Sequence, residues 1–229
     1  MLVLHFQPDT ASTILRLVAA VAGITLSLRP VDRAGGELDS PTWRAMNPTG
    51  TIPVLETPQG PLSETAACLL WLSDRHGLGP RADQPGRTDF LKWLFYISNT
   101  PHADLMQLIY PQRYCPPGNE AGHATLIAGR FLVSLGHLDD AARRTPDLFG
   151  PGGPLLCYIL VLARWAAFYP EGHAGWFQLA AFPALNALAT ETEALAAVQA
   201  IAADEGLGAL PFTEPTGGSD VANLKTTAR

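Results

Sequence analysis

Apolar and polar residues at the start of the chain form a short strand pattern followed by a helical one. Residues 2–6 are an apolar run that stops at a Pro-Asp pair, as expected for a buried strand. Gly23 is expected to end the helix that follows, and either Ser12 or Asp9 to cap its start. Five apolar residues with helical spacing define this helix: Ile14, Leu15, Leu17, Val18 and Val21.

The next segment continues this alternation of strands and helices. Residues 24–31 alternate between apolar and polar side chains, which predicts a strand, and Ser40 before a proline predicts the start of a short helix. Two short strands are expected at 51–57 and 60–64, followed by a helix over 64–77. The order β-α-β-α-β-β-α indicates an α/β unit with a mixed sheet.

The composition changes after the first 78 residues. Residues 79–86 are rich in Gly and Pro, as in a linker, and the segments beyond have helical periodicity. We therefore expect a first domain over 1–78, an all-helical domain over 87–210 and a loose tail over 211–229. The helices expected in the second domain cover residues 87–114 (bent near Pro101), 120–144, 153–169 and 174–204 (broken at Pro183).

Composition and charge narrow the class of protein. The 229 residues carry a formal net charge of -6, and no stretch gathers Lys and Arg, which argues against nucleic acid or an anionic membrane as partner. The three cysteines are widely spaced and show no metal-ligand pattern, so we expect no metal and a reducing compartment. No apolar run is long enough to span a membrane. We expect a cytoplasmic protein.

A helix start rich in polar residues is the first candidate binding site. Glu64 and Thr65 fall in the first turn of a predicted helix, with Ser63 as the expected N-cap. Free N–H groups and the positive end of the helix dipole attract a carboxylate there. Plain helix capping is the alternative. Pro53, just before an apolar pair, is compatible with an ordinary edge strand.

Two motifs in this region resemble the glutathione S-transferase family, in particular its bacterial beta-like and theta-like members. They are "NPTGTIPVL" and "LSETAACLLWL", at the family's spacing and in the family's order of elements. The resemblance implies a thioredoxin-like first domain, a helical second domain, glutathione as co-substrate and a homodimer. It further implies a cis peptide before Pro53, with the backbone of Ile52 pairing with the cysteinyl unit of glutathione. Glu64 and Thr65 would hold its γ-glutamyl end.

The sequence departs from the family at the residue that activates the thiol. Matching the first helix places Asp9 where theta-like members have serine, and Ala11 where beta-like members have cysteine. Thr10 and Ser12 are the remaining hydroxyl candidates, and Ser12 is equally compatible with an N-cap. His102 is a third candidate, because residues 99–102 align with a histidine-bearing segment of beta-like members. A structural role beside Pro101 is the alternative.

The same resemblance implies a pocket for a hydrophobic electrophile, with Met106, Tyr110 and Arg113 as candidate lining residues. The expected function is conjugation of the glutathione thiolate to that electrophile. The alternative is a non-catalytic binding or assembly module with the same fold. Thiol-disulfide chemistry is a third candidate, ranked last because it normally uses a cysteine where Ala11 stands. The sequence does not identify the electrophile.

Overall fold

The computed structural model describes residues 1–169 and 175–207. Its first part is a mixed four-stranded sheet with strand order β2-β1-β3-β4. β1 pairs in parallel with β2 and antiparallel with β3, and β3 pairs antiparallel with β4. The elements are β1 (Leu2–Phe6), α1 (Ala11–Val21), β2 (Leu26–Pro30), α2 (Pro41–Met46), β3 (Val54–Thr57), β4 (Gly60–Ser63) and α3 (Thr65–His76). The expected thioredoxin-like order is confirmed.

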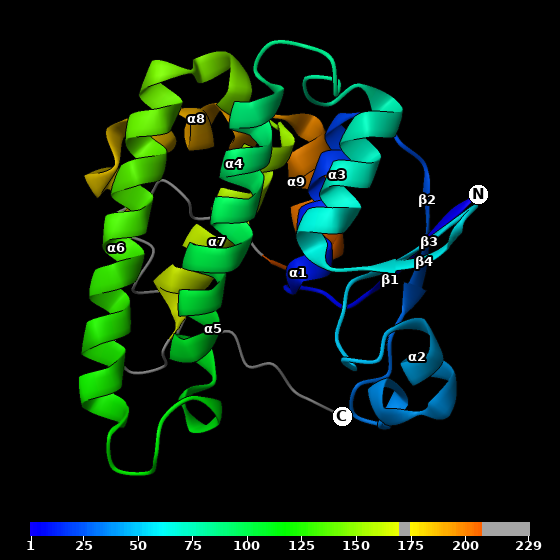
Figure 1. Cartoon of the computed structure of the whole chain (residues 1–229), viewed down its shortest axis with the longest axis horizontal. Helices are drawn as coiled ribbons and strands as arrows, with labels where there is room; N and C mark the ends of the chain where they lie inside the picture. The colour runs from blue at the N-terminus through cyan, green and yellow to red at the C-terminus, as the bar shows by residue number, and fades with distance from the viewer. Residues whose placement is uncertain (170–174, 208–229) are drawn as a thin grey trace.

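The alternation of side chains along the strands divides the sheet into two faces. Leu4 and Leu55 are fully buried in the main core with residues of α1 and α3, which lie on the side of the sheet facing the helical half (Figure 1). Val54 belongs to a second, smaller cluster with Trp43 of α2. Because neighbouring strand residues point to opposite faces, one sheet supports both helix layers.

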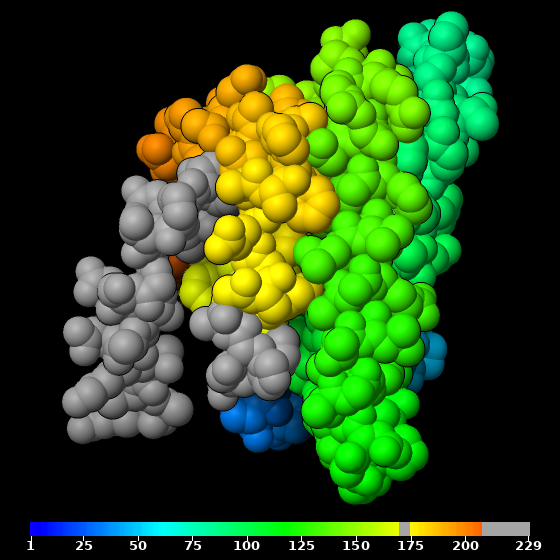
Figure 2. Space-filling model, turned by 90° about the vertical axis from the view of Figure 1, so that its left-hand side faces the viewer, coloured from blue at the N-terminus to red at the C-terminus, as the bar shows by residue number. Residues whose placement is uncertain are grey.

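The second part is helical. It contains α4 (Arg87–Ile97), α5 (Ala103–Ile109), α6 (Glu120–Arg144), α7 (Pro154–Phe168), α8 (Pro183–Glu193) and α9 (Ala196–Asp204). α7 is buried along nearly its whole length and lies in the interior, whereas α6 runs along the outside (Figures 1 and 2). Among the described residues, no helix is both long and apolar enough to cross a membrane.

Several expected element boundaries are wrong. The single helix expected over 87–114 is interrupted by a π-helical segment at Ser98–His102, where Pro101 has no N–H to donate, and α5 ends at Ile109. The break expected at Pro183 is confirmed, because a 3-10 segment ends at Ala181 and α8 begins at Pro183. The expected tail at 211–229 lies outside the described residues.

Two helix starts also differ from the sequence prediction. Thr10, not Ser12 or Asp9, caps α1, since its hydroxyl accepts the N–H of Ser12 and it shares a reciprocal capping box with Thr13. Glu64, not Ser63, is the N-cap of α3, because Ser63 still belongs to β4. Thr10 and Glu64 both line one cavity.

Candidate functional site

A cavity of about 890 Å³ lies where the first domain meets the helical half. It falls within the size range of small-molecule sites. The first part of the chain contributes the β1–α1 loop, α2, the segment before β3 and the start of α3, and the second part contributes α5 and α7. The lining includes every predicted site residue except Ser12, namely Thr10, Ile52, Pro53, Glu64, Thr65, His102, Met106, Tyr110 and Arg113.

Backbone conformation marks two residues of this cavity. Asp9, with φ of 52°, and Glu64, with φ of 71°, are the non-glycine residues with positive φ within the described ranges. A side chain in this region costs on the order of 1–3 kcal/mol, and such residues cluster at functional sites. Both line the cavity, from two different loops.

The segment before β3 presents free backbone groups to the cavity. The Ile52–Pro53 peptide bond is cis, and both residues line the wall. Within the described residues, no hydrogen bond uses the backbone N–H or C=O of Ile52. A bound peptide could therefore pair with Ile52 as a neighbouring strand would.

Asn47 and Gly50 determine the shape of the loop that precedes this segment. The buried Asn47 amide donates to the carbonyl of Thr51 at 2.8 Å and so closes the loop. Gly50 has φ of 66°, and a Cβ there would lie 2.6 Å from the guanidinium carbon of Arg44. Only glycine easily adopts this positive φ and also leaves room for the Arg44 side chain. The two residues hold Ile52 in place.

The start of α3 offers unpaired donors to the same cavity. No side chain caps the helix, and Glu64 and Thr65 both line the wall. The first N–H groups of a helix have no partner within the helix and carry the positive end of its dipole. The Glu64 carboxylate has no hydrogen bond or ion pair among the described residues. An anion and a cation could therefore bind side by side here.

Three of the six carboxylate and guanidinium groups in the wall are already paired. Arg44 forms a 2.6 Å ion pair with Asp39. The Asp9 carboxylate, which stands where the family resemblance places a serine, accepts from Arg164 Nε at 3.0 Å and Trp165 Nε1 at 3.1 Å. Arg33 and Arg113, by contrast, have no acidic partner within the described residues. With Glu64, the cavity retains one unpaired acid and two unpaired guanidinium groups.

The two hydroxyl candidates for thiol activation have other roles in this structure. The Thr10 hydroxyl donates to the Gln7 carbonyl at 2.7 Å and caps α1. Ser12 is fully buried and absent from the cavity wall, and its hydroxyl lies 3.0 Å from the Gln7 carbonyl and 2.7 Å from the Thr10 hydroxyl. The closed hydrogen-bond triangle leaves Ser12 without access to a ligand. Thr10 lines the wall, but its hydroxyl proton is already used in the hydrogen bond to the Gln7 carbonyl.

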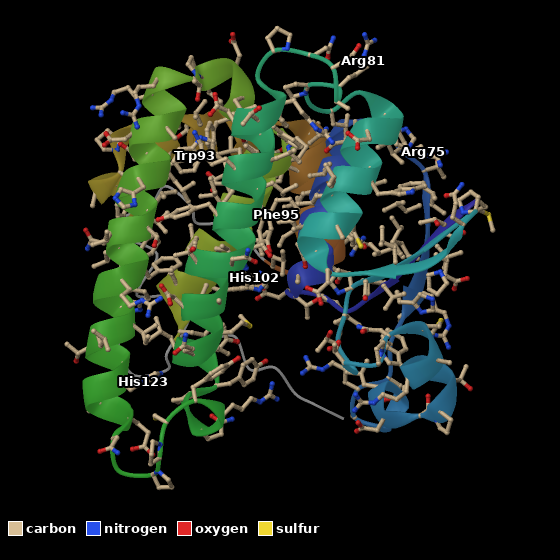
Figure 3. All side chains as sticks on the ribbon, viewed as in Figure 1. Arg75, Arg81, Trp93, Phe95, His102 and His123 are labelled. Carbon is tan, nitrogen blue, oxygen red and sulfur yellow. The ribbon has the colours of Figure 1, made fainter. Side chains whose placement is uncertain are left out.

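His102 is the candidate with a free polar atom. It is partly buried, lines the cavity and lies between the helical half and the start of α3 (Figure 3). Its Nδ1 is 2.7 Å from the hydroxyl of Tyr158, and Nε2 has no partner among the described residues. Burial lowers the pKa of His102 to about 4, so the imidazole is neutral at physiological pH. Burial raises the pKa of Tyr158, which keeps its proton.

When the Tyr158 hydroxyl donates a hydrogen bond to Nδ1, Nδ1 is the acceptor, and the one N–H of the neutral imidazole is on Nε2. An N–H at that position can donate a hydrogen bond to a thiolate. Burial, the larger effect, raises the pKa of Tyr158, whereas the side chains of Ser98 and Thr65 lower it. Through His102, the buried Tyr158 hydroxyl connects α7 to the π-helical segment.

Sequence reasoning missed the residues that hold the β1–α1 loop. The buried Glu205 carboxylate, just after α9, accepts from the Asp9 N–H at 3.0 Å, the Thr13 hydroxyl at 2.6 Å and Arg16 Nη1 at 2.7 Å. Arg164, which belongs to α7, forms an ion pair with the Asp9 side chain. No local signal reveals such pairs, since their members are more than 150 positions apart in sequence.

The wall on the helical side is mostly apolar and aromatic. Met106, Tyr110 and Arg113 line it, and Ile109, Trp165 and Tyr169 complete it. The latter three were not predicted, because helical aromatic and aliphatic residues resemble core positions in sequence.

The three cysteines do not line the cavity. Cys68 and Cys157 are buried, which raises the pKa of each thiol to about 12, and Cys115 is partly exposed. The structure groups no three His, Cys, Asp or Glu side chains as metal ligands in the described ranges.

Comparisons with known proteins agree with this geometry. Residues 11–75 match the family model of the glutathione S-transferase N-terminal domain. A glutathione S-transferase of Xanthomonas campestris pv. campestris is 24% identical over 89% of this chain and 98% of its own. A glutathione transferase homologue from sulfitobacter, solved with bound glutathione, covers 90% of this chain and 98% of its own with a TM-score of 0.74 and 23% identity.

Relatives with another name also match. The probable elongation factor 1-gamma 2 of Arabidopsis thaliana is 35% identical over 56% of this chain, which spans 33% of that protein's length.

The fold and the site therefore define a two-domain protein with a thioredoxin-like first domain and a helical second domain. Residues 11–75 match the N-terminal domain of the glutathione S-transferase family, and both halves have the fold of solved glutathione transferases.

Proposed function

We propose that the chain binds glutathione in this cavity and transfers its thiolate sulfur to a hydrophobic electrophile on the helical side. The observation that carries this proposal is that one cavity joins Ile52, Glu64 and Thr65 to His102. The first three offer groups for a zwitterionic peptide, and the fourth has a free imidazole nitrogen. The neighbouring apolar wall offers a place for a second molecule.

Each polar part of glutathione has a candidate partner. Glu64 would pair with the ammonium group of the γ-glutamyl unit, and the Thr65 hydroxyl and N–H with its carboxylate. The free N–H and C=O of Ile52 would bind the cysteinyl unit, as they would an added strand. The unpaired Arg33 is available for the second carboxylate, that of the glycyl unit.

His102 is the activating residue in this proposal. A hydrogen bond from Nε2 would stabilise the thiolate and lower the pKa of the bound thiol, which is about 8.5 when free. The sulfur then forms a bond to the electrophilic carbon while the leaving group departs with its electron pair. No covalent enzyme intermediate is needed, since the contribution of the protein is orientation and charge stabilisation.

A second candidate function is a non-catalytic binding or assembly module. Two observations favour it: an aspartate paired with Arg164 stands where theta-like relatives have serine, and the relatives include proteins named elongation factor 1-gamma. In this case the cavity would bind glutathione without turnover. The intact set of binding groups at Ile52, Glu64 and Thr65 favours the transferase.

Two assays separate these functions: retention on immobilised glutathione, and conjugation of glutathione to 1-chloro-2,4-dinitrobenzene. A transferase is retained and turns over, and His102→Gln reduces kcat on the order of 10²-fold while the KM for glutathione stays within about threefold. Retention without turnover would establish the module instead. Absence of both would remove the glutathione site.

Family resemblance also leads us to propose a cytoplasmic homodimer and the division into domains at residues 78 and 87. Sedimentation equilibrium tests the first point. A mass of twice the 24.4 kDa chain supports the homodimer, and the mass of a single chain contradicts it.

A further inference from the structure

Arg113 is the guanidinium group of the described cavity wall that has neither an acidic partner nor a proposed contact with glutathione. It ends the short 3-10 segment Pro111–Arg113 after α5, and its guanidinium carbon lies 4.4 Å from the centre of the Tyr110 ring. Its side chain has no acidic partner within the described residues, although it lines the cavity. Stacking on a ring fixes the plane of a guanidinium and leaves its N–H edge free to donate.

The charges of the cavity support an anion at this place. Asp9 is paired with Arg164 and Asp39 with Arg44, so neither acid neutralises the helical side. Glutathione itself would take up Glu64 and Arg33. One positive charge then remains, on the side of the wall where the second substrate would bind.

The groups around Arg113 define the rest of that substrate. Met106, Ile109 and Trp165 offer an apolar and aromatic surface in the same cavity. A planar guanidinium binds a carboxylate through two parallel hydrogen bonds, which a neutral group of the same shape cannot reproduce.

We propose that Arg113 makes the cavity selective for electrophiles that carry one carboxylate on an aromatic body. This inference rests on the proposed transferase function. In the reaction the glutathione thiolate attacks the ring carbon that bears chlorine, the carbon–sulfur bond forms and chloride leaves. The carboxylate takes no part in the chemistry and only positions the ring.

The test compares 4-chloro-3,5-dinitrobenzoate with its neutral amide, 4-chloro-3,5-dinitrobenzamide, in wild type and Arg113→Gln. Arg113 is exposed, so the charge pair contributes less than a buried one would, and we expect the KM for the benzoate to rise roughly three- to tenfold in Arg113→Gln. The KM for the amide and for glutathione should stay within about twofold. Arg113→Lys should fall between wild type and Arg113→Gln.

Arg75→Gln is the matched control. Arg75 also stacks on an aromatic ring, that of Trp71 at 4.9 Å, but it lies on α3 away from His102 and outside the cavity (Figure 3). It should change neither KM. Equal effects of Arg113→Gln on benzoate and amide, or no effect on either, would overturn the inference.

Binding of the two conjugation products separates this inference from the transferase proposal. Calorimetry would measure the affinity of glutathione S-conjugates that carry the carboxylated or the amidated ring. Tighter binding of the carboxylated conjugate that is lost in Arg113→Gln supports the anion site even where turnover is absent. Turnover of both electrophiles without this preference overturns the anion site and keeps the transferase.

Discussion

At the residue scale, Asp9 shows how a departure from the family pattern can be built into the structure. Its backbone has φ of 52°, its N–H donates to Glu205, and its carboxylate is held by Arg164 and Trp165 of α7. A free carboxylate next to the sulfur would repel a thiolate, but this one is neutralised by a buried guanidinium. The same pair connects the cavity loop to the most buried helix.

Asp9→Asn should therefore destabilise the fold strongly. It keeps the shape of the side chain but leaves the buried Arg164 without a counter-charge, which typically costs about 3–5 kcal/mol. Urea unfolding measures this change. Asp39→Asn is the control, since the Asp39–Arg44 pair is exposed and should be worth about 1 kcal/mol or less. Equal losses in the two variants would contradict this role of Asp9.

His102 should make stability depend on pH in a defined window. Its pKa of about 4 in the folded protein lies below the ordinary value of 6.5, so between these values the unfolded chain binds a proton that the folded chain does not. Stability is therefore lost as the pH falls from about 6.5 towards 4, by at most about 3 kcal/mol.

His102→Gln should remove this loss, because glutamine does not titrate and can still bond to Tyr158. Urea unfolding of both proteins at pH 7 and pH 4.5 isolates the effect, since groups such as Asp104 titrate equally in each. If both proteins lost the same stability on acidification, His102 would not be the cause.

The sequence could predict part of the site at this scale. Pro53, Glu64 and Thr65 were identified from local motifs, and all three line the cavity. Ser12 was a reasonable candidate by position, yet the chain buries it under the Thr10 cap. Partners such as Arg164 and Glu205 could not be found, because their pairings depend on how distant helices pack.

At the element scale, the α1 start is held from the far end of the described chain. Glu205 follows α9 and binds Thr13 and Arg16 of α1. The strands and most helices were predictable because the spacing of their apolar residues is visible within a few positions and their ends carry Gly or Pro. The interruption between α4 and α5 was not, because the sequence predicts a bend at Pro101 but not the added π-helical turn.

Glu205→Gln should loosen this connection. It leaves Arg16 with a weaker partner in a buried position, and we expect a loss of about 2–4 kcal/mol in the free energy of unfolding. Asp204→Asn is the matched control, because Asp204 also binds Arg16 but its side chain is 63% exposed. We expect that control to cost about 1 kcal/mol or less. The opposite ranking would refute the role of Glu205.

At the scale of the whole molecule, the two halves of the described chain meet at one cavity. The first half supplies unpaired backbone groups and Glu64, and the second supplies His102, Arg113 and an apolar wall. The arrangement of helices around the sheet could be predicted from the family motifs in the sequence (Figure 1). The pairing of Asp9 with Arg164 could not be expected in this way, because it depends on a contact between the halves.

The most direct test of the central claim is calorimetric titration of reduced glutathione into wild type, Glu64→Gln and Glu120→Gln. Glu120 also lies in the first turn of a helix, but outside the cavity. We predict one site per chain, affinity at least about tenfold weaker in Glu64→Gln, and no change in Glu120→Gln. No binding by wild type, or equal binding by all three proteins, would contradict the account.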